Sequence, residues 1–164
     1  MRKLILITLL ILSITNIGKS QSIESKIRDF AKYEYPNDLE MQKYTYKKQL
    51  SAYNYMVSVT DSEVKKIAVR EYPNDYSMQK YTYEKQLAAK RYMKTTIDME
   101  VKQIATYEYP NDYSMQKYTY EKQLSAKNYM KTVKNSSAKA QAVREYPRDY
   151  SMQKYIYDKI VFGN

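Results

Sequence analysis

The chain has 164 residues, a net charge of +10, 21 tyrosines and no cysteine, histidine or tryptophan. Its length suits one domain, and the missing residue types exclude thiol nucleophiles, imidazole bases and the usual zinc ligands. Two glycines in the whole chain cannot build a phosphate loop or a dinucleotide fingerprint. We therefore predict no catalytic residue, no metal site and no cofactor.

The first 20 residues are typical of a secretory signal peptide. Residues 1–3 are basic, residues 4–14 are apolar apart from one threonine and one serine, and Gly18 and Ser20 are the small residues expected before a cut at Gln21. The apolar run is shorter than the ~20 residues that span a bilayer, which disfavours the alternative of a membrane anchor. We expect cleavage between Ser20 and Gln21, a secreted or periplasmic protein, and no membrane span in the mature chain.

The rest of the chain is organised around one repeated stretch, Glu71–Leu87, which begins Glu-Tyr-Pro-Asn-Asp. It recurs from Glu34, Glu108 and Glu145 at a spacing of 37 residues, which indicates duplication. The sequence therefore predicts a single repeat domain over residues 21–164. Its parts are a half unit 21–33, three repeats 34–70, 71–107 and 108–144, and a truncated repeat 145–164.

The first part of each repeat predicts a long helix, as in residues 75–95, which lack glycine and proline and are rich in helix-forming residues. Pro73 suits its first turn, and Asn74 or Asp75 its N-cap. A helical wheel gives two apolar stripes on roughly opposite sides, which predicts a helix packed between neighbours. One stripe holds Tyr76, Tyr83 and Leu87, and the other holds Met78, Tyr81, Ala88, Ala89 and Tyr92.

The second part predicts a short helix. Asp61, Asp98 and Asn135 are its expected N-caps, with a capping box from Thr60 to Glu63 in the first repeat. The helix should stop near the tyrosine that precedes each proline. A β-branched cluster separates the long helix from the short one, and the alternative interpretation is one long bent helix.

These elements predict an all-α fold: a stack of helical hairpins, similar to an α-solenoid, with eight helices and about three and a half repeats. The period lies close to that of tetratricopeptide repeats, but the signature residues of that family are missing, so we assign no family. The last helix carries Ile156, Ile160 and Val161 where the other repeats have Thr, Gln and Leu. A helix this apolar either caps the stack or offers a patch to a partner.

Tyrosines that recur with the repeat are the first candidates for a binding surface. Most of them are expected in the core, because tyrosine rings bury well and keep a hydroxyl for the solvent edge. The alternative is that one column lines a groove for a peptide, sugar or base, and wheel angles place Tyr81 and Tyr83 on opposite sides. Tyrosinate iron binding is a third hypothesis, and no acidic constellation supports it. The candidate column is Tyr44, Tyr81, Tyr118 and Tyr155.

Two lysine columns are the second candidates, since regular charges along a face suit a periodic polyanion. They are Lys43, Lys80, Lys117 and Lys154, and Lys48, Lys85, Lys122 and Lys159. The alternative is a solvated helix surface whose charges are partly neutralised by acids four residues on. Three of the basic residues fall in the leader, and the excess that remains is mild for a nucleic-acid binder.

Repetition favours binding over catalysis, because a catalytic carboxylate pair should be singular whereas every repeat carries the same acids. The Asp38, Asp75, Asp112 and Asp149 column is better explained as helix N-caps. We expect an exported, non-enzymatic protein-interaction or structural module with a protein partner or self-association. The alternative is a binding module for an anionic or sugar polymer, and a carboxylate-based hydrolase is a third hypothesis.

Overall fold

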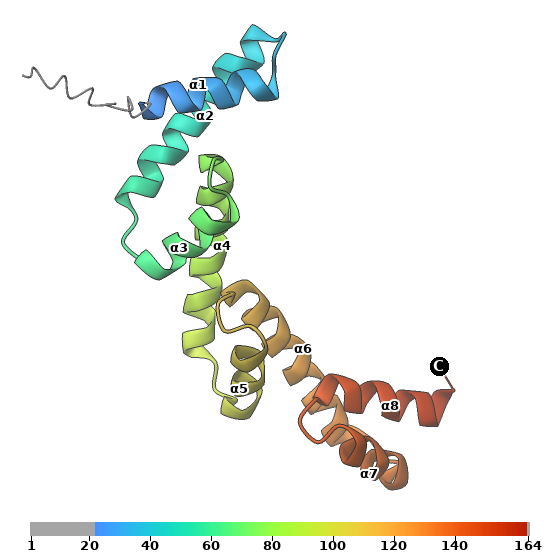
Figure 1. Ribbon diagram of the computed structural model, residues 1–164. Helices are drawn as coiled ribbons and strands as arrows, with labels where there is room; N and C mark the ends of the chain where they lie inside the picture. Colours follow the sequence, from blue (N-terminus) through green and yellow to red (C-terminus); the bar gives the residue numbers. More distant parts are fainter. Residues whose placement is uncertain (1–21, 164) are drawn as a thin grey trace, which may run out of the picture.

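The computed structural model describes residues 22–163, where all regular structure is α-helical and short helices alternate with long ones (Figure 1). The helices are α1 (Ile23–Glu34), α2 (Leu39–Ser58), α3 (Ser62–Glu71), α4 (Tyr76–Thr95), α5 (Met99–Glu108), α6 (Tyr113–Thr132), α7 (Ser136–Glu145) and α8 (Tyr150–Phe162). The predicted all-α architecture with eight helices is confirmed. The alternative prediction of one long bent helix is wrong, because the chain leaves helical geometry between Ser58 and Ser62. The predicted leader and its cut at Ser20 and Gln21 lie outside the described residues.

Each helix begins at a polar side chain that accepts a hydrogen bond from a free N–H group of the first turn. Asp75 accepts from the Met78 N–H at 2.9 Å, and Asp61 accepts from the Val64 N–H at 3.1 Å. Pro73 lies before the Asp75 cap, in the turn rather than in the first helical turn. The predicted capping box is wrong as well, because Asp61 rather than Thr60 is the N-cap of α3.

The Tyr-Pro-Asn-Asp segment, which is Tyr-Pro-Arg-Asp in the last unit, folds each short helix back onto the long helix that follows it. The Tyr72 N–H donates to the Ala68 carbonyl at 3.1 Å, and the Gln79 side-chain amide donates to the Tyr72 carbonyl at 2.7 Å. Proline then prevents the helix from continuing. The same glutamine bond holds the turn in all four units, from Gln42, Gln79, Gln116 and Gln153.

The hairpins stack because each long helix packs against the next long helix, which gives the elongated, curving arrangement of Figure 1. A small buried cluster lies at each of three joints, built from a methionine of one long helix, two residues of the short helix and a tyrosine of the next long helix. The clusters are Met56, Val64, Ala68 and Tyr83; Met93, Val101, Ala105 and Tyr120; and Met130, Ala138, Ala142 and Tyr157. Stability is therefore distributed over nearest-neighbour joints, as in other repeat proteins.

The packed faces of the long helices only partly match the predicted stripes. In α4 the first stripe is confirmed, since Tyr83 is buried and Tyr76 and Leu87 are half-buried. The second is wrong for Tyr81 and Ala88, which are exposed. Its place is taken by a row with polar members, namely Gln79, Thr82, Gln86, Ala89 and Met93. Across residues 22–163, none of the helices combines the length and the apolar character needed to cross a membrane.

Candidate interaction surface

The exposed side of the long helices carries a repeated pair of one tyrosine and one lysine. The tyrosines are Tyr44, Tyr81, Tyr118 and Tyr155, and the lysines four residues later are Lys48, Lys85, Lys122 and Lys159, all exposed. Residues four apart lie on one side of a helix, so each pair presents a ring and a charge together. Tyr81 keeps 59% of its surface accessible, although the joints bury other tyrosines almost completely. We call these eight residues the Tyr–Lys strip.

The other predicted lysine column lies largely within the joints. The Lys80 ammonium lies 4.9 Å from the ring centroid of Tyr55 on the preceding long helix and 3.9 Å from Glu84. Lys117 and Lys154 repeat this arrangement over Tyr92 and Tyr129. Cation–π contacts of this kind stabilise partly desolvated sites, so these lysines join neighbouring units. No long helix precedes α2 within the described residues, and Lys43 pairs with Glu40 at 2.8 Å.

An acidic residue completes each of these joints. The Tyr129 hydroxyl donates to the Asp158 carboxylate at 2.6 Å, and Lys154 reaches the same carboxylate at 2.6 Å. The hydrogen bond to Asp158, followed by burial, raises the pKa of Tyr129 to about 12. At Tyr55 burial is the larger cause and the carboxylate of Glu84 the smaller one, and both raise the pKa of the phenol. Each joint thus places a phenol between a lysine and a carboxylate.

The Tyr129 contact predicts a titration that can be measured. A folded pKa raised above the ordinary value of 10 gives stability that is complete below pH 10 and is lost as the pH rises through about 12. Replacing Asp158 with asparagine should move the Tyr129 titration back toward pH 10, because the carboxylate that favours the neutral phenol is gone. Tyrosinate absorbance, with the Tyr129→Phe variant as the reference that isolates this phenol, measures the shift. An unchanged titration in the Asp158→Asn variant would contradict the assignment.

Sequence reasoning missed a buried glutamine that links each unit to the next. The Gln86 side chain donates to the Asp112 carboxylate at 2.8 Å and accepts from the Ser114 N–H at 3.1 Å, so it holds the N-terminus of the next long helix. Gln49 and Gln123 make the same two bonds one unit away. Their constant position in the repeat was visible in the sequence, but a glutamine on a helix carries no signal of burial.

A second missed feature is the half-buried lysine of two middle units. Lys90 pairs with Asp61 at 2.9 Å and with Glu63 at 2.7 Å, and Tyr113 donates to Glu63 at 2.6 Å. The hydrogen bond to Glu63, and after it the bond to Asp61, raise the pKa of Lys90 above its usual range, and burial opposes them. Lys127 repeats the arrangement with Asp98 and Glu100.

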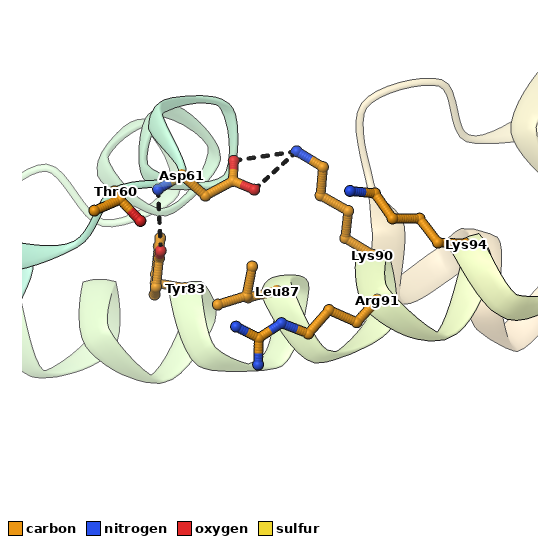
Figure 2. A pocket seen from close by; sticks show the side chains of 7 residues that line it. All are labelled: Thr60, Asp61, Tyr83, Leu87, Lys90, Arg91 and Lys94. Carbon is orange, nitrogen blue, oxygen red and sulfur yellow. Dashed lines mark hydrogen bonds and ion pairs between the residues drawn. The ribbon is translucent and has the colours of Figure 1, made fainter.

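Lys90 is one of seven residues that line a pocket of about 380 Å³, and Figure 2 shows their side chains. Lys90 points at both carboxylate oxygens of Asp61, and the Tyr83 hydroxyl faces the Asp61 N–H, which donates to it at 3.4 Å. Arg91 and Lys94 also line the pocket. Asp61 is thus paired with Lys90 and is the N-cap of α3, so this pocket belongs to the contact between α3 and α4.

The first and last units differ from the inner units at positions that contact a neighbouring unit. Ile160 stands where Gln49, Gln86 and Gln123 hold the next helix, and no helix follows α8 within the described residues. At the other end, Leu39 replaces the tyrosine found at Tyr76, Tyr113 and Tyr150. Lys47 replaces the acid found at Glu84, Glu121 and Asp158. The two ends are thus chemically different from the joints between them.

No protein family, no curated protein and no solved structure matches the chain. Within residues 22–163 no group of three or more acidic side chains is placed to hold a metal ion. The four aspartates considered for catalysis, Asp38, Asp75, Asp112 and Asp149, are helix N-caps.

Proposed function

We propose that the protein is an exported, non-enzymatic helical-repeat module of the periplasm or cell surface that binds a protein partner through the Tyr–Lys strip. The observation that carries this proposal is the exposure of Tyr44, Tyr81, Tyr118 and Tyr155 in a scaffold that buries Tyr83, Tyr120 and Tyr157. Tyrosine is enriched at protein interfaces because a large rigid ring and a hydroxyl give contact area at low entropic cost.

The strip has the properties of a contact surface rather than of a packing surface. Its tyrosines recur at one position of successive units, so a partner that spans several units meets the same ring and charge repeatedly. Repeat proteins commonly bind through such extended faces, and multiplication of weak contacts gives affinity without a deep pocket. A surface of this kind suits an extended or elongated protein.

The experiment is a pull-down from the native cell envelope with the chain from Gln21 onward, compared with the Tyr81→Ser, Tyr118→Ser double variant. We expect a specific protein band at both low and high salt, and a loss of about tenfold or more in recovery with the double variant, since central tyrosines dominate many interfaces. Tyr107→Ser is the matched control, because Tyr107 is 89% exposed but lies on α5, outside the strip. Equal recovery with all three proteins would refute the proposal.

The alternative function is binding of an anionic or sugar polymer of the envelope or matrix. The lysines of the strip favour it, since Lys48, Lys85, Lys122 and Lys159 are exposed and regularly repeated. Polyanion binding would give retention on a heparin column and an affinity that falls steeply with salt. The salt dependence of the pull-down therefore separates the two functions.

A further inference from the structure

A groove with an apolar floor and a basic rim lies along the seam between α1 and α2. Its volume is about 340 Å³, and it is lined by Arg28, Ala31 and Lys32 of α1 and by Leu39, Gln42, Lys43, Tyr46 and Lys47 of α2. Leu39 keeps 69% of its surface accessible. A large apolar side chain among four cations is an arrangement that a partner can recognise.

The same groove exists in the middle of the stack, where a helix fills it. In the second unit the equivalent positions include Ala68, Tyr76, Lys80 and Tyr83, and the preceding helix α2 lies on them. Tyr53 packs edge-on against Tyr76 at 5.1 Å, Tyr55 packs against Tyr83 at 6.2 Å, and Met56 joins the Ala68 and Tyr83 cluster. Gln49 bonds the Asp75 cap at 2.8 Å. The groove of the first unit therefore corresponds to the face of the second unit that α2 covers.

One charge at the rim of this groove is reversed relative to the middle of the stack. In the inner joints the phenol that sits at the Tyr55 position lies between a lysine and an acid. In the first unit both flanking positions are lysines, Lys43 and Lys47. Lys43 pairs with Glu40 at 2.8 Å, so the charge that differs from the inner joints is that of Lys47, and a carboxylate placed beside Lys47 would complement it. A partner tyrosine at this position would have no carboxylate to accept its hydroxyl hydrogen bond, because Lys47 replaces that acid.

We propose that this groove binds an amphipathic helix of another protein, with an aspartate or glutamate placed between Lys43 and Lys47. The partner helix lies on the first unit as α2 lies on the second. It places a glutamine near the Asp38 cap and apolar side chains over Leu39 and Tyr46. Its carboxylate takes the position that Tyr55 has in α2. Within α2 these positions correspond to Gln49, Tyr53 and Met56, which have the i, i+4, i+7 spacing of one helix face, and to Tyr55 at the edge of that face. The proposal rests on the proposed function, because it specifies the class of protein partner and a second contact for it.

A second copy of the chain fits the groove less well than an acidic partner. The free long helix at the other end of the stack, α8, ends at Phe162, and Gly163 stands at the position of the buried alanines Ala52, Ala89 and Ala126. Ile160 replaces the linking glutamine. The apolar leader segment, residues 4–14, contains no acid, so it cannot supply the carboxylate either.

The test uses two labelled helical peptides with the sequence of residues 44–59, held helical by a staple on the outward face because short helices are marginal in water. One has the native Tyr55, and the other carries Tyr55→Glu. Fluorescence anisotropy with the chain from Gln21 onward, which contains all eight described helices, should give about tenfold tighter binding of the glutamate peptide. The Lys47→Glu variant restores the charge of the inner joints and should invert that preference.

The matched control is Lys85→Glu, which makes the same change of charge on the Tyr–Lys strip of α4 and should leave both affinities unchanged. The Tyr81→Ser, Tyr118→Ser variant should also bind the glutamate peptide normally, so failure of the proposed function and failure of the groove are distinguished. Equal binding of the two peptides, or equal effects of Lys47→Glu and Lys85→Glu, would overturn the proposal.

Two further outcomes would replace the proposed occupant. If sedimentation shows dimers of the native chain that Lys47→Glu abolishes, a second copy occupies the groove. If the chain from Gln21 binds the glutamate peptide but the full chain from Met1 does not, the leader occupies it. A monomer that binds the peptide in both forms supports the acidic partner helix.

Discussion

Replacing Tyr120 with alanine should lower the free energy of unfolding by about 3–5 kcal/mol, the usual cost of removing a large aromatic side chain from a core. Tyr120 is only 3% exposed and forms one cluster with Met93, Val101 and Ala105. Its hydroxyl also accepts a hydrogen bond from the Asp98 N–H at 3.3 Å. The side chain therefore joins three helices. Denaturant unfolding followed by circular dichroism measures the effect.

Two variants separate burial from the chemistry of tyrosine. Tyr118→Ala changes the same residue type two positions away on the exposed side of α6 and should cost less than about 0.5 kcal/mol. Tyr120→Phe keeps the ring and loses only the acceptor of the Asp98 N–H, so about 1 kcal/mol is expected. Similar losses from Tyr118→Ala and Tyr120→Ala would contradict the assignment of these tyrosines to opposite sides.

The sequence was sufficient for the helices because local signals agree with the fold. Polar caps such as Asp61 and Asp98, helix formers in the interior and a proline after each short helix all act over a few residues. The packing partners could not be derived in the same way. The helical wheel places Tyr81 in an apolar stripe and so predicts that it is buried, but Tyr81 is exposed. Gln86 is buried because its side-chain amide bonds two groups of the next unit.

The candidate site was predicted only in part, because helix geometry can be read from the sequence and packing partners cannot. Opposite placement of Tyr81 and Tyr83 follows from helix geometry alone, and the structure has one exposed and the other buried. The two lysine columns looked alike in sequence, and only packing distinguishes Lys80, which lies over a ring of the preceding helix, from Lys85, which is exposed. The role of Lys90 could not be predicted, because its partners Asp61 and Glu63 lie at the start of α3, far away in the sequence.

Replacing Gln86 with leucine should destabilise the joint between α4 and α6 by about 2–3 kcal/mol. The Ser114 N–H would lose its acceptor, which costs about 1–3 kcal/mol for a partly buried donor, and the Asp112 carboxylate would lose a charge-assisted bond. Extra apolar burial of leucine offsets part of this loss. Because the stack is held by nearest-neighbour joints, the loss should also divide the unfolding transition, with helices α1–α4 and α5–α8 separating in stability.

The last unit supplies the control, since it already carries an aliphatic residue at this position. Ile160 is 43% exposed, so Ile160→Gln should change the free energy of unfolding by less than about 0.5 kcal/mol. Hydrogen exchange gives the second readout: Gln86→Leu should raise exchange most at the first turn of α6, where the Ser114 N–H is released. Uniform loss of protection along the chain would mean that Gln86 supports the fold in general and does not link one unit to the next. Localised loss would establish that the polar row of each long helix sets the register of the stack, while the apolar clusters supply most of its stability.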